Sequence, residues 1–581
     1  MISALSLEKF ADSDIIIGAD YRVVFSSPEL QPAAGKLADY ISKVTGNRLS
    51  VSGDTDSEKA VILQTDGGKI SNGFNIAAKG DSVFISGSSL SQTVRGVYAF
   101  LEKFCGVNCF TSEIAVYSLD EIRVPSGTDY SYAPYFEYTD TDWLSPKNTE
   151  YSLFNGLNGS QYRKIPAEFG GTVSYISGFG HTLTNQFCSK DKYFESHPEY
   201  FSLNMGRRKA NQLCLSNPEV LEIVTEEVFE LLRKKHNPEA DLQIISLTQN
   251  DNIFFCRCAK CRAIDKKYGS HAGTMLEFVN AIARKVKEAG YDNVVLDTFA
   301  YRYTRAVPHG IAPEDNVCVR LCSIECCFSH PLDDPSCKTN VSFMKDLKGW
   351  SEICKRLYIW DYCTNYSNFT GIFPDFGTLQ KNMQIFYEHN VKGVYEEGNY
   401  TMNTCDTEFG ELRAYLISKL YQNPYRDLKA DRDAFLAAYY GAGGEYVGEF
   451  LDIITENAPK KHLGIYQPMT STLSLSSKQI AECDKLWEKA EEAAEAEAKI
   501  NVRNSALSWR YWKMKNRASE FSDSAKYEEN KAKLTDDINA TGIEKWYEST
   551  PMTAFFTSVY QMLFFSLYPV INSIVNLIYR V

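Results

Sequence analysis

The sequence has little histidine, no excess of basic residues and no phosphate-binding motif. Only 8 of its 581 residues are histidine, which argues against a Ser-His-Asp triad. The 74 acidic residues outnumber the 61 basic ones, and the net charge of −13 repels nucleic-acid backbones and anionic lipid. No Gly-rich phosphate loop, nucleotide fingerprint or internal repeat occurs. Nucleic acid is therefore not expected as a partner.

The N-terminal twenty residues lack a basic start followed by an apolar stretch of signal-peptide length. The resulting expectation is a cytoplasmic location. In a reducing compartment the 16 cysteines should be mostly buried thiols rather than a disulfide framework. No pattern in the sequence indicates an oligomeric state.

Residues 549–579 contain no charged side chain, and this stretch is long enough to cross a bilayer. However, polar side chains recur at about every fourth position and form a stripe, and Pro569 interrupts the helix. The stripe consists of Thr553, Thr557, Gln561, Tyr568, Asn572 and Asn576. We therefore expect a kinked helical hairpin that packs against the rest of the protein rather than a membrane anchor.

The length and the changing periodicity predict three domains. Residues 1–128 indicate an α/β domain with helices over 30–44 and 91–104, a strand over 60–64, and a hairpin of 74–77 and 83–86. Residues 129–440 predict a (β/α)8 TIM barrel, because short apolar strands alternate with helical stretches. Residues 441–581 predict an α-helical domain, in which Ile480, Cys483, Leu486, Trp487 and Ala490 form one apolar stripe.

Eight strands are expected in the barrel. They cover residues 136–143, 172–176, 212–215, 242–247, 294–299, 317–324, 357–360 and 393–395. Active sites of such barrels lie at the carboxyl ends of the strands. Those ends are rich in carboxylates here, as glycoside hydrolysis requires: one acid to protonate the leaving oxygen and one base or nucleophile.

The expected catalytic groups are four carboxyls that follow different strands: Asp251, Glu325, Asp361 and Glu396. Asp251 is the candidate general acid and Glu396 the candidate base or nucleophile, whereas Asp361 and Glu325 would position or polarise. Further residues at the strand ends would hold hydroxyl groups and sugar ring faces. These are Trp143, His181, Asn250, Tyr301, Arg302, Trp360, Tyr362 and Glu397.

Three cysteines, Cys256, Cys258 and Cys261, lie just past Asp251 at a spacing that could hold zinc. A structural site needs a fourth ligand, for which His271, Cys326 or Cys327 are the nearby candidates, and the sequence supplies no clear second pair. Free buried thiols are therefore favoured over a zinc site, and no metal or other cofactor is expected.

Several separated motifs resemble a bacterial family labelled domain of unknown function 4838, over roughly residues 143–441. They are His197-Pro198-Glu199-Tyr200, Asn250-Asp251-Asn252 with the cysteines that follow, Trp360-Asp361-Tyr362 and Gly393-Val394-Tyr395-Glu396. The segment from Arg95 to Glu102 resembles the α/β domain that precedes the barrel in bacterial α-glucuronidases and β-hexosaminidases. The resemblance implies glycosidase relatives.

The resemblance also marks a departure at the fourth strand. The hexosaminidases carry an Asp-Glu pair there, where this chain has Asn250-Asp251, so an acetamido-assisted mechanism is in doubt. In the α-glucuronidases a strand-four acid works with later carboxylates, which is closer to Asp251, Asp361 and Glu396. The leading hypothesis is an intracellular glycoside hydrolase acting on oligosaccharides. The alternatives are a non-catalytic carbohydrate-binding protein on the same barrel and a zinc-organised scaffold.

Overall fold

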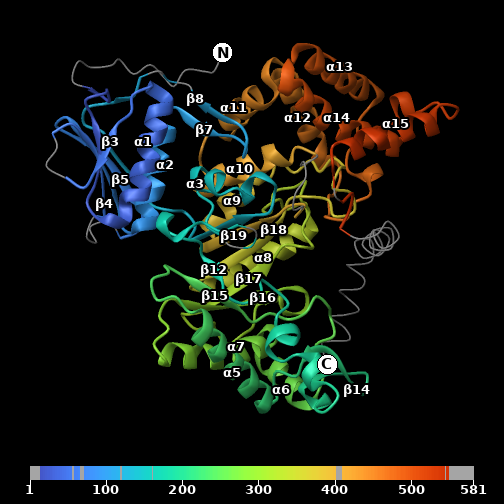
Figure 1. Ribbon diagram of the computed structural model, residues 1–581. Coiled ribbons are helices and arrows are strands. Elements are labelled where there is room, and N and C mark those ends of the chain that lie inside the picture. The colour runs from blue at the N-terminus through green and yellow to red at the C-terminus, as the bar shows by residue number, and fades with distance from the viewer. Residues whose placement is uncertain are drawn as a thin grey trace.

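The structure is a computed structural model (Figure 1). It describes residues 14–54, 58–65, 71–117, 119, 121–159, 161, 163–400, 408–543 and 545–548. The apolar segment 549–579, for which a docked hairpin is expected, lies outside these residues. Within the described part of the chain, no helix combines the length and the apolar character that crossing a bilayer requires.

The N-terminal part is a six-stranded sheet with two helices, α1 (Gln31–Thr45) and α2 (Leu90–Phe104), on the side that faces the rest of the chain (Figure 1). The strand order is β10 (Asp129–Tyr132), β5 (Phe74–Lys79), β6 (Ser82–Gly87), β4 (Ala60–Thr65), β2 (Arg22–Phe25) and β3 (Ser50–Ser52). The predicted helices, strand and hairpin are confirmed. Gly46 ends α1 in the left-handed conformation, with φ 74°. β10 lies past residue 128 and still pairs with β5.

The central part is a curled sheet of seven parallel strands. Their order is β11 (Tyr138–Thr141), β19 (Val391–Glu397), β18 (Leu357–Tyr362), β17 (Val317–Cys322), β16 (Val294–Ala300), β15 (Gln243–Ser246) and β12 (Ser174–Tyr175). Seven of the eight expected strands each overlap one of these. Helices cover the outside of the sheet: α3 (Thr149–Phe154), α5 (Pro218–Lys235), α7 (His271–Glu288), α8 (Lys338–Ile353), α9 (Leu379–Glu388) and α10 (Gly410–Gln422). Between β16 and β17 the only helical element that the structure describes is the short turn Arg302–Thr304.

The predicted strand 212–215 is wrong. This segment ends β14 (Arg207–Leu213), which pairs antiparallel with β13 (Phe201–Asn204) in a hairpin outside the parallel sheet. The turn between them has positive φ at Met205 (49°) and Gly206 (73°), which is the geometry of a tight hairpin. β12 therefore pairs directly with β15. A short apolar run followed by a capped helix is compatible with a strand of the parallel sheet and with a strand of a hairpin. The sequence pattern therefore did not distinguish the two.

Residues Asn158 and Gly159 span the gap between the two edge strands β11 and β12. Their backbone N–H groups donate to the Thr139 carbonyl at 3.2 and 3.0 Å. On the other side Val173 N–H donates to the Asn158 carbonyl at 2.9 Å, and Gly159 forms a parallel bridge with Val173. The backbone groups of both edges are thus paired at this point.

Side chains of the parallel strands alternate between two environments, as the pleat requires. The inner face carries a cluster with one buried member from each of six strands: Tyr138, Ile244, Val295, Cys318, Tyr358 and Tyr395. The outer face packs against the helices; Val394 of β19, for example, shares a core with Ile417 of α10. This alternation decides which strand-end residues can meet inside the sheet.

The C-terminal part of the described chain is helical (Figure 1). It contains α11 (Leu428–Tyr440), α12 (Gly444–Asn457), α13 (Ser477–Ala493), α14 (Ala496–Asn516) and α15 (Tyr527–Ala540). Four members of the predicted stripe, Cys483, Leu486, Trp487 and Ala490, form the buried face of α13, and Ile480 is half-buried. Ser476 begins α13 with a capping box that includes Gln479.

Candidate active site at the carboxyl ends of the parallel strands

Glu397 is the carboxyl of β19 that faces the inside of the sheet. It alternates with Glu396 and shares its face with Tyr395, a member of the inner cluster. The indole Nε1 of Trp360, on the neighbouring strand β18, donates to Glu397 Oε2 at 2.6 Å. Burial raises the pKa of Glu397 well above its usual value, and the nearby Asp142 carboxyl raises it further. The protonated form of Glu397 is therefore favoured.

Asp251 lies at the end of β15 in a different environment. Its side chain is 55 % exposed. Its Oδ1 accepts a hydrogen bond from the Tyr301 hydroxyl at 2.8 Å and pairs with Arg302 Nε at 3.1 Å. A cation and a hydroxyl donor both stabilise the ionised form of a carboxyl group. Asp251 is thus exposed and paired with a cation, whereas Glu397 is held beside an indole and a second carboxyl.

Aromatic side chains connect these two carboxyls. The Tyr301 ring contacts Phe299 at a centroid distance of 6.2 Å, and Phe299 contacts the Trp360 ring at 5.6 Å. Phe299 and Tyr301 are buried in one cluster on the inside of the sheet, and the partly buried Trp360 packs against it. Asp251 is bonded to Tyr301 at one end of the cluster, and Glu397 to Trp360 at the other.

Tyr466 and Glu548 come from the C-terminal part of the chain and lie beside the same carboxyls. The Tyr466 hydroxyl donates to Glu548 Oε2 at 2.6 Å. Burial raises the pKa of the Tyr466 phenol, and the carboxyls of Glu548, Glu397 and Asp251 add to this. The backbone N–H of Glu548 donates to the Tyr366 carbonyl at 2.9 Å, which fixes this segment. No periodicity or motif in the sequence pointed to either residue.

Asp142, the residue after β11, was also missed, although its position at a strand end was a signal. It is fully buried, and its carboxyl accepts from the Tyr395 hydroxyl at 3.0 Å and from the Gly398 N–H. Burial raises the pKa of Asp142 to about 7. These bonds hold the end of β19, and with it Glu397, in place.

The structure does not bring Glu396 and Asp361 together with Asp251. Both side chains lie on the outer face of the sheet and are buried at 3 % and 5 % exposure. Ser323 Oγ donates to Asp361, whose pKa burial raises to about 6. Burial also raises the pKa of Glu396, and the neighbouring Asp361 and Asp375 carboxyls add to the shift. The catalytic assignment of Glu396 and Asp361 stays a prediction, because both side chains lie on the outer face of the sheet.

The remaining predicted carboxyl, Glu325, accepts from Arg305 NH1 at 2.9 Å, and the same guanidinium pairs with Asp346 at 2.7 Å. Glu325 is thus part of an ion-pair network beside the strand ends. Trp143 is 1 % exposed, which leaves no ring face for a ligand.

Three predicted binding residues adjoin Asp251 or Trp360. The His181 imidazole Nδ1 lies 2.7 Å from the Gln249 carbonyl, and its ring contacts Phe299. The Asn250 amide donates to Thr184 Oγ1 at 2.5 Å and to the Asn211 carbonyl at 2.6 Å, so it holds the loop rather than facing a ligand. Tyr362 is buried, with its ring stacked 6.5 Å from Trp360.

The cysteine motif after Asp251 lies outside this site. Its predicted fourth partner His271 instead contacts Asp265, with Nδ1 2.7 Å from Oδ2. Every cysteine in the described part of the chain is a free thiol. The sulfur that joins the motif belongs to Cys214, at the end of the β13–β14 hairpin.

Fold and site together define a protein with a curled parallel α/β sheet whose carboxyl-end site carries carboxyl groups and aromatic rings. The chain belongs to the family described as domain of unknown function (DUF4838), whose model matches residues 109–452. No curated protein matches the sequence.

Several solved structures of glycoside hydrolases are similar to this chain. A GH138 enzyme that targets pectin rhamnogalacturonan II is 11 % identical, with 90 % of each chain covered and a TM-score of 0.43. The GH20 β-N-acetylhexosaminidase from Streptomyces coelicolor A3(2) is 13 % identical, with 76 % of this chain and 94 % of that chain covered and a TM-score of 0.42. A family 89 glycoside hydrolase from Clostridium perfringens is 11 % identical, with 88 % and 65 % covered and a TM-score of 0.48.

Proposed function

We propose that this protein is a glycoside hydrolase that cleaves oligosaccharides or glycosides at the carboxyl ends of a (β/α)8 barrel. In this proposal residues 157–159 take the place of one barrel strand, between β11 and β12. The barrel lies between an N-terminal α/β domain and a C-terminal helical domain. The observation that carries the proposal is the contrast between Glu397, buried with a raised pKa, and Asp251, exposed and paired with Arg302. Acid/base glycoside cleavage uses one protonated and one ionised carboxyl, and we assign these roles to Glu397 and Asp251.

Glu397 is the proposed proton donor. Because Trp360 Nε1 donates to Oε2, we assign the proton of the neutral acid to Oε1. As the bond between the anomeric carbon and the glycosidic oxygen breaks, its electron pair goes to the oxygen, which takes the proton from Glu397. The positive charge that develops on the sugar ring then needs a nearby carboxylate.

Asp251 is the proposed carboxylate. It either activates a water molecule or attacks the anomeric carbon, and the carboxyl separation during substrate binding decides between inversion and retention. Water supplies the hydroxyl of the new hemiacetal, and its proton goes to whichever carboxyl is then ionised. Arg302 and Tyr301 position Asp251 through their contacts with Oδ1, and Trp360 and Tyr466 offer ring faces and a hydroxyl to the sugar. The initial assignment of Glu396 as base would require its side chain to reach the inner face.

The test is an assay of the full chain against aryl glycosides and glucuronyl oligosaccharides. We expect wild-type hydrolysis of at least one substrate and a loss of about 100-fold or more for Asp251→Asn, which preserves the shape but not the charge. Tight sugar binding by calorimetry without any turnover would favour the alternative, a non-catalytic carbohydrate-binding protein. Neither binding nor turnover across the panel would count against both.

A further inference from the structure

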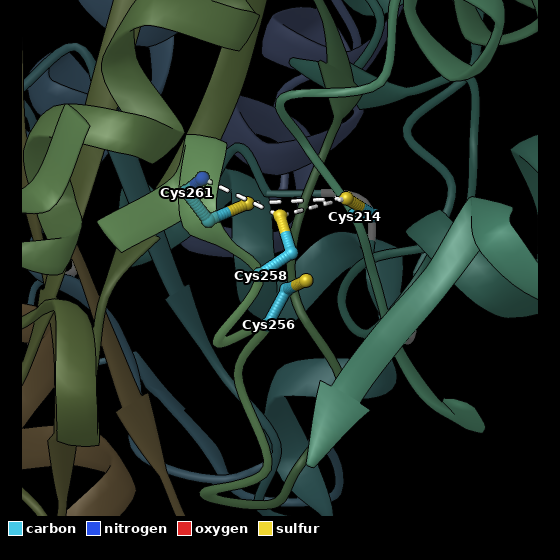
Figure 2. A group of neighbouring side chains, drawn as sticks. All are labelled: Cys214, Cys256, Cys258 and Cys261. Atoms are coloured by element: carbon cyan, nitrogen blue, oxygen red, sulfur yellow. Dashed lines mark hydrogen bonds between the residues drawn. The ribbon is translucent and has the colours of Figure 1, made fainter. Parts of the chain in front are cut away.

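Four cysteine sulfurs meet beside the strand-end site, although the sequence supplies only three of them together. Cys256, Cys258 and Cys261 come from the segment after Asp251, and Cys214 approaches from the hairpin (Figure 2). Cys214 Sγ lies 3.7 Å from Cys258 Sγ and 3.9 Å from Cys261 Sγ. All four sulfurs lie within 4.8 Å of one another.

These distances fit a metal centre and not a disulfide. Sulfurs in a disulfide are about 2.05 Å apart. Four sulfurs at about 2.3 Å from a tetrahedral zinc ion are about 3.8 Å apart from one another. The geometry points to a structural zinc site formed by Cys214, Cys256, Cys258 and Cys261. With four protein ligands such a site is closed, so it holds the fold and leaves no position for a substrate.

The surroundings of the sulfurs suit thiolate ligands. Leu203 N–H points at Cys256 Sγ at 3.4 Å, and Cys261 N–H points at Cys258 Sγ at the same distance. Such donors around metal ligands orient them and stabilise their charge. Arg208 NH1 lies 3.7 Å from Cys256 Sγ. Its positive charge offsets part of the net charge of −2 that zinc with four thiolates carries.

The cluster ties the hairpin to the loop that carries Asp251. Next to Cys214, the Gln212 amide donates to the Asn250 carbonyl at 2.9 Å and to Asn252 Oδ1 at 3.0 Å. Cys258 caps the N-terminus of α6 (Ala259–Tyr268), which continues from the same loop. A zinc ion at the cluster would therefore fix both sides of the Asp251 loop. The zinc site itself does not depend on the proposed function, but its importance for catalysis rests on Asp251 being catalytic.

A second set of ligands stands independently of the four cysteines. Cys327, His330 and Cys337 follow β17, and His462 comes from the C-terminal part of the chain. Cys327 Sγ lies 3.1 Å from His330 Nδ1, and Cys337 Sγ lies 3.7 Å from His462 Nδ1. The four ligand atoms lie within 4.8 Å of one another, and Leu463 N–H points at Cys327 Sγ at 3.3 Å.

Two thiolates and two imidazoles are a common structural zinc set. We infer that this second set also binds zinc, and that it joins the segment after β17 to the C-terminal part. The sequence spacing concealed both sets, because in each case one ligand comes from a distant segment.

Metal content tests both sites without reference to activity. The full chain, expressed without a polyhistidine tag and purified under reducing conditions, is measured by inductively coupled plasma mass spectrometry. We expect two zinc ions per chain. Cys258→Ser, at the most accessible thiol of the first set, and His462→Gln, at the exposed ligand of the second, should each lose one. Cys483→Ser, a buried thiol of the helical part, is the matched control and should keep both.

Cobalt substitution gives a second readout. Each site should show the visible bands of tetrahedral cobalt with thiolate charge-transfer absorption, and each variant should lose the bands of its own site. Thermal unfolding distinguishes metal loss from misfolding in the variants. A wild-type chain that holds no zinc and takes up none on reconstitution would overturn both sites. If the wild-type chain holds only one zinc ion, the variant that still holds this ion identifies the set that does not bind zinc.

Discussion

Glu396 and Glu397 are neighbours in the chain and face opposite sides of β19. The sequence identified this strand end as acidic, but the choice between the two depends on the pleat phase, which a one-residue shift inverts. The hydrogen bond from the Trp360 indole to Glu397 shows that Glu397 is the residue on the inner face. Asp251, Tyr301 and Arg302 were predicted as site residues and lie together, because they end neighbouring strands. Tyr466 and Glu548 could not be found, since only the tertiary fold brings them there.

The Trp360 indole bond should set the pKa of Glu397, because it stabilises the ionised carboxyl. Trp360→Phe removes the donor and keeps a ring, so the pKa of Glu397 should rise further. Activity that needs the protonated acid is lost as pH rises through this pKa. The alkaline limb of the pH profile of kcat/KM should therefore move to higher pH, by about one unit for a bond of roughly 1.4 kcal/mol. A limb that stays in place would show that Glu397 is not the titrating acid.

Asp142 should make stability depend on pH. Its folded pKa, about 7, lies above the ordinary value of 3.8, so its contribution is fully present at acid pH and is lost as pH rises through about 7. Asp142→Asn keeps an acceptor for Gly398 N–H and removes the titration. Urea unfolding between about pH 5 and pH 8 should show a stability decline in wild type that is shallower in the variant. Equal slopes would contradict the buried, raised Asp142.

At the scale of elements, the strand pattern of the parallel sheet was largely predictable, since buried parallel strands read as short apolar runs. The exceptions have physical causes. The segment 212–215 has the same apolar character in a hairpin strand, and the closure by Asn158 and Gly159 uses two residues without any periodicity. A polar interaction fixes this closure: the Asn158 amide oxygen accepts from Thr139 N–H at 2.9 Å.

Gly159 should be intolerant of a side chain. A Cβ there would lie 2.2 Å from Asp140 Oδ2, and Asp140 cannot retreat because it pairs with the buried Arg163. Gly159→Ala should lower the free energy of unfolding by about 1–3 kcal/mol. Gly35→Ala is the control: it lies inside α1 with no atom within 4 Å of the new Cβ, and should stabilise by about 0.5–1 kcal/mol. Equal effects in urea titrations would argue against a tight closure at residue 159.

At the scale of the whole molecule, the N-terminal sheet and the central sheet share one core. Phe154 of α3 packs edge-on against Tyr40 of α1 and Tyr98 of α2, at centroid distances of 5.2 and 4.7 Å. Lys419 of α10 is buried and pairs with Glu102 of α2 at 2.8 Å. The sequence predicted the units from their periodicities, whereas the contacts between them depend on single residues far apart in the chain.

Removal of residues 1–132 should therefore prevent independent folding of the remainder. It would expose the Phe154 ring and leave the Lys419 charge without its partner. We expect aggregation, or a soluble product without a cooperative thermal transition, measured by light scattering and calorimetry. A monodisperse product that unfolds cooperatively would show that the central sheet is a self-sufficient domain.

The most direct test of the account compares Glu397→Gln with Glu396→Gln on a glycoside that the wild type cleaves. Gln cannot donate the proton, so Glu397→Gln should lower kcat/KM by about 100-fold or more. Glu396 is buried with a raised pKa, and Gln resembles its neutral form, so Glu396→Gln should retain nearly the wild-type rate. The reverse order, with Glu396→Gln inactive and Glu397→Gln active, would contradict the inner-face site.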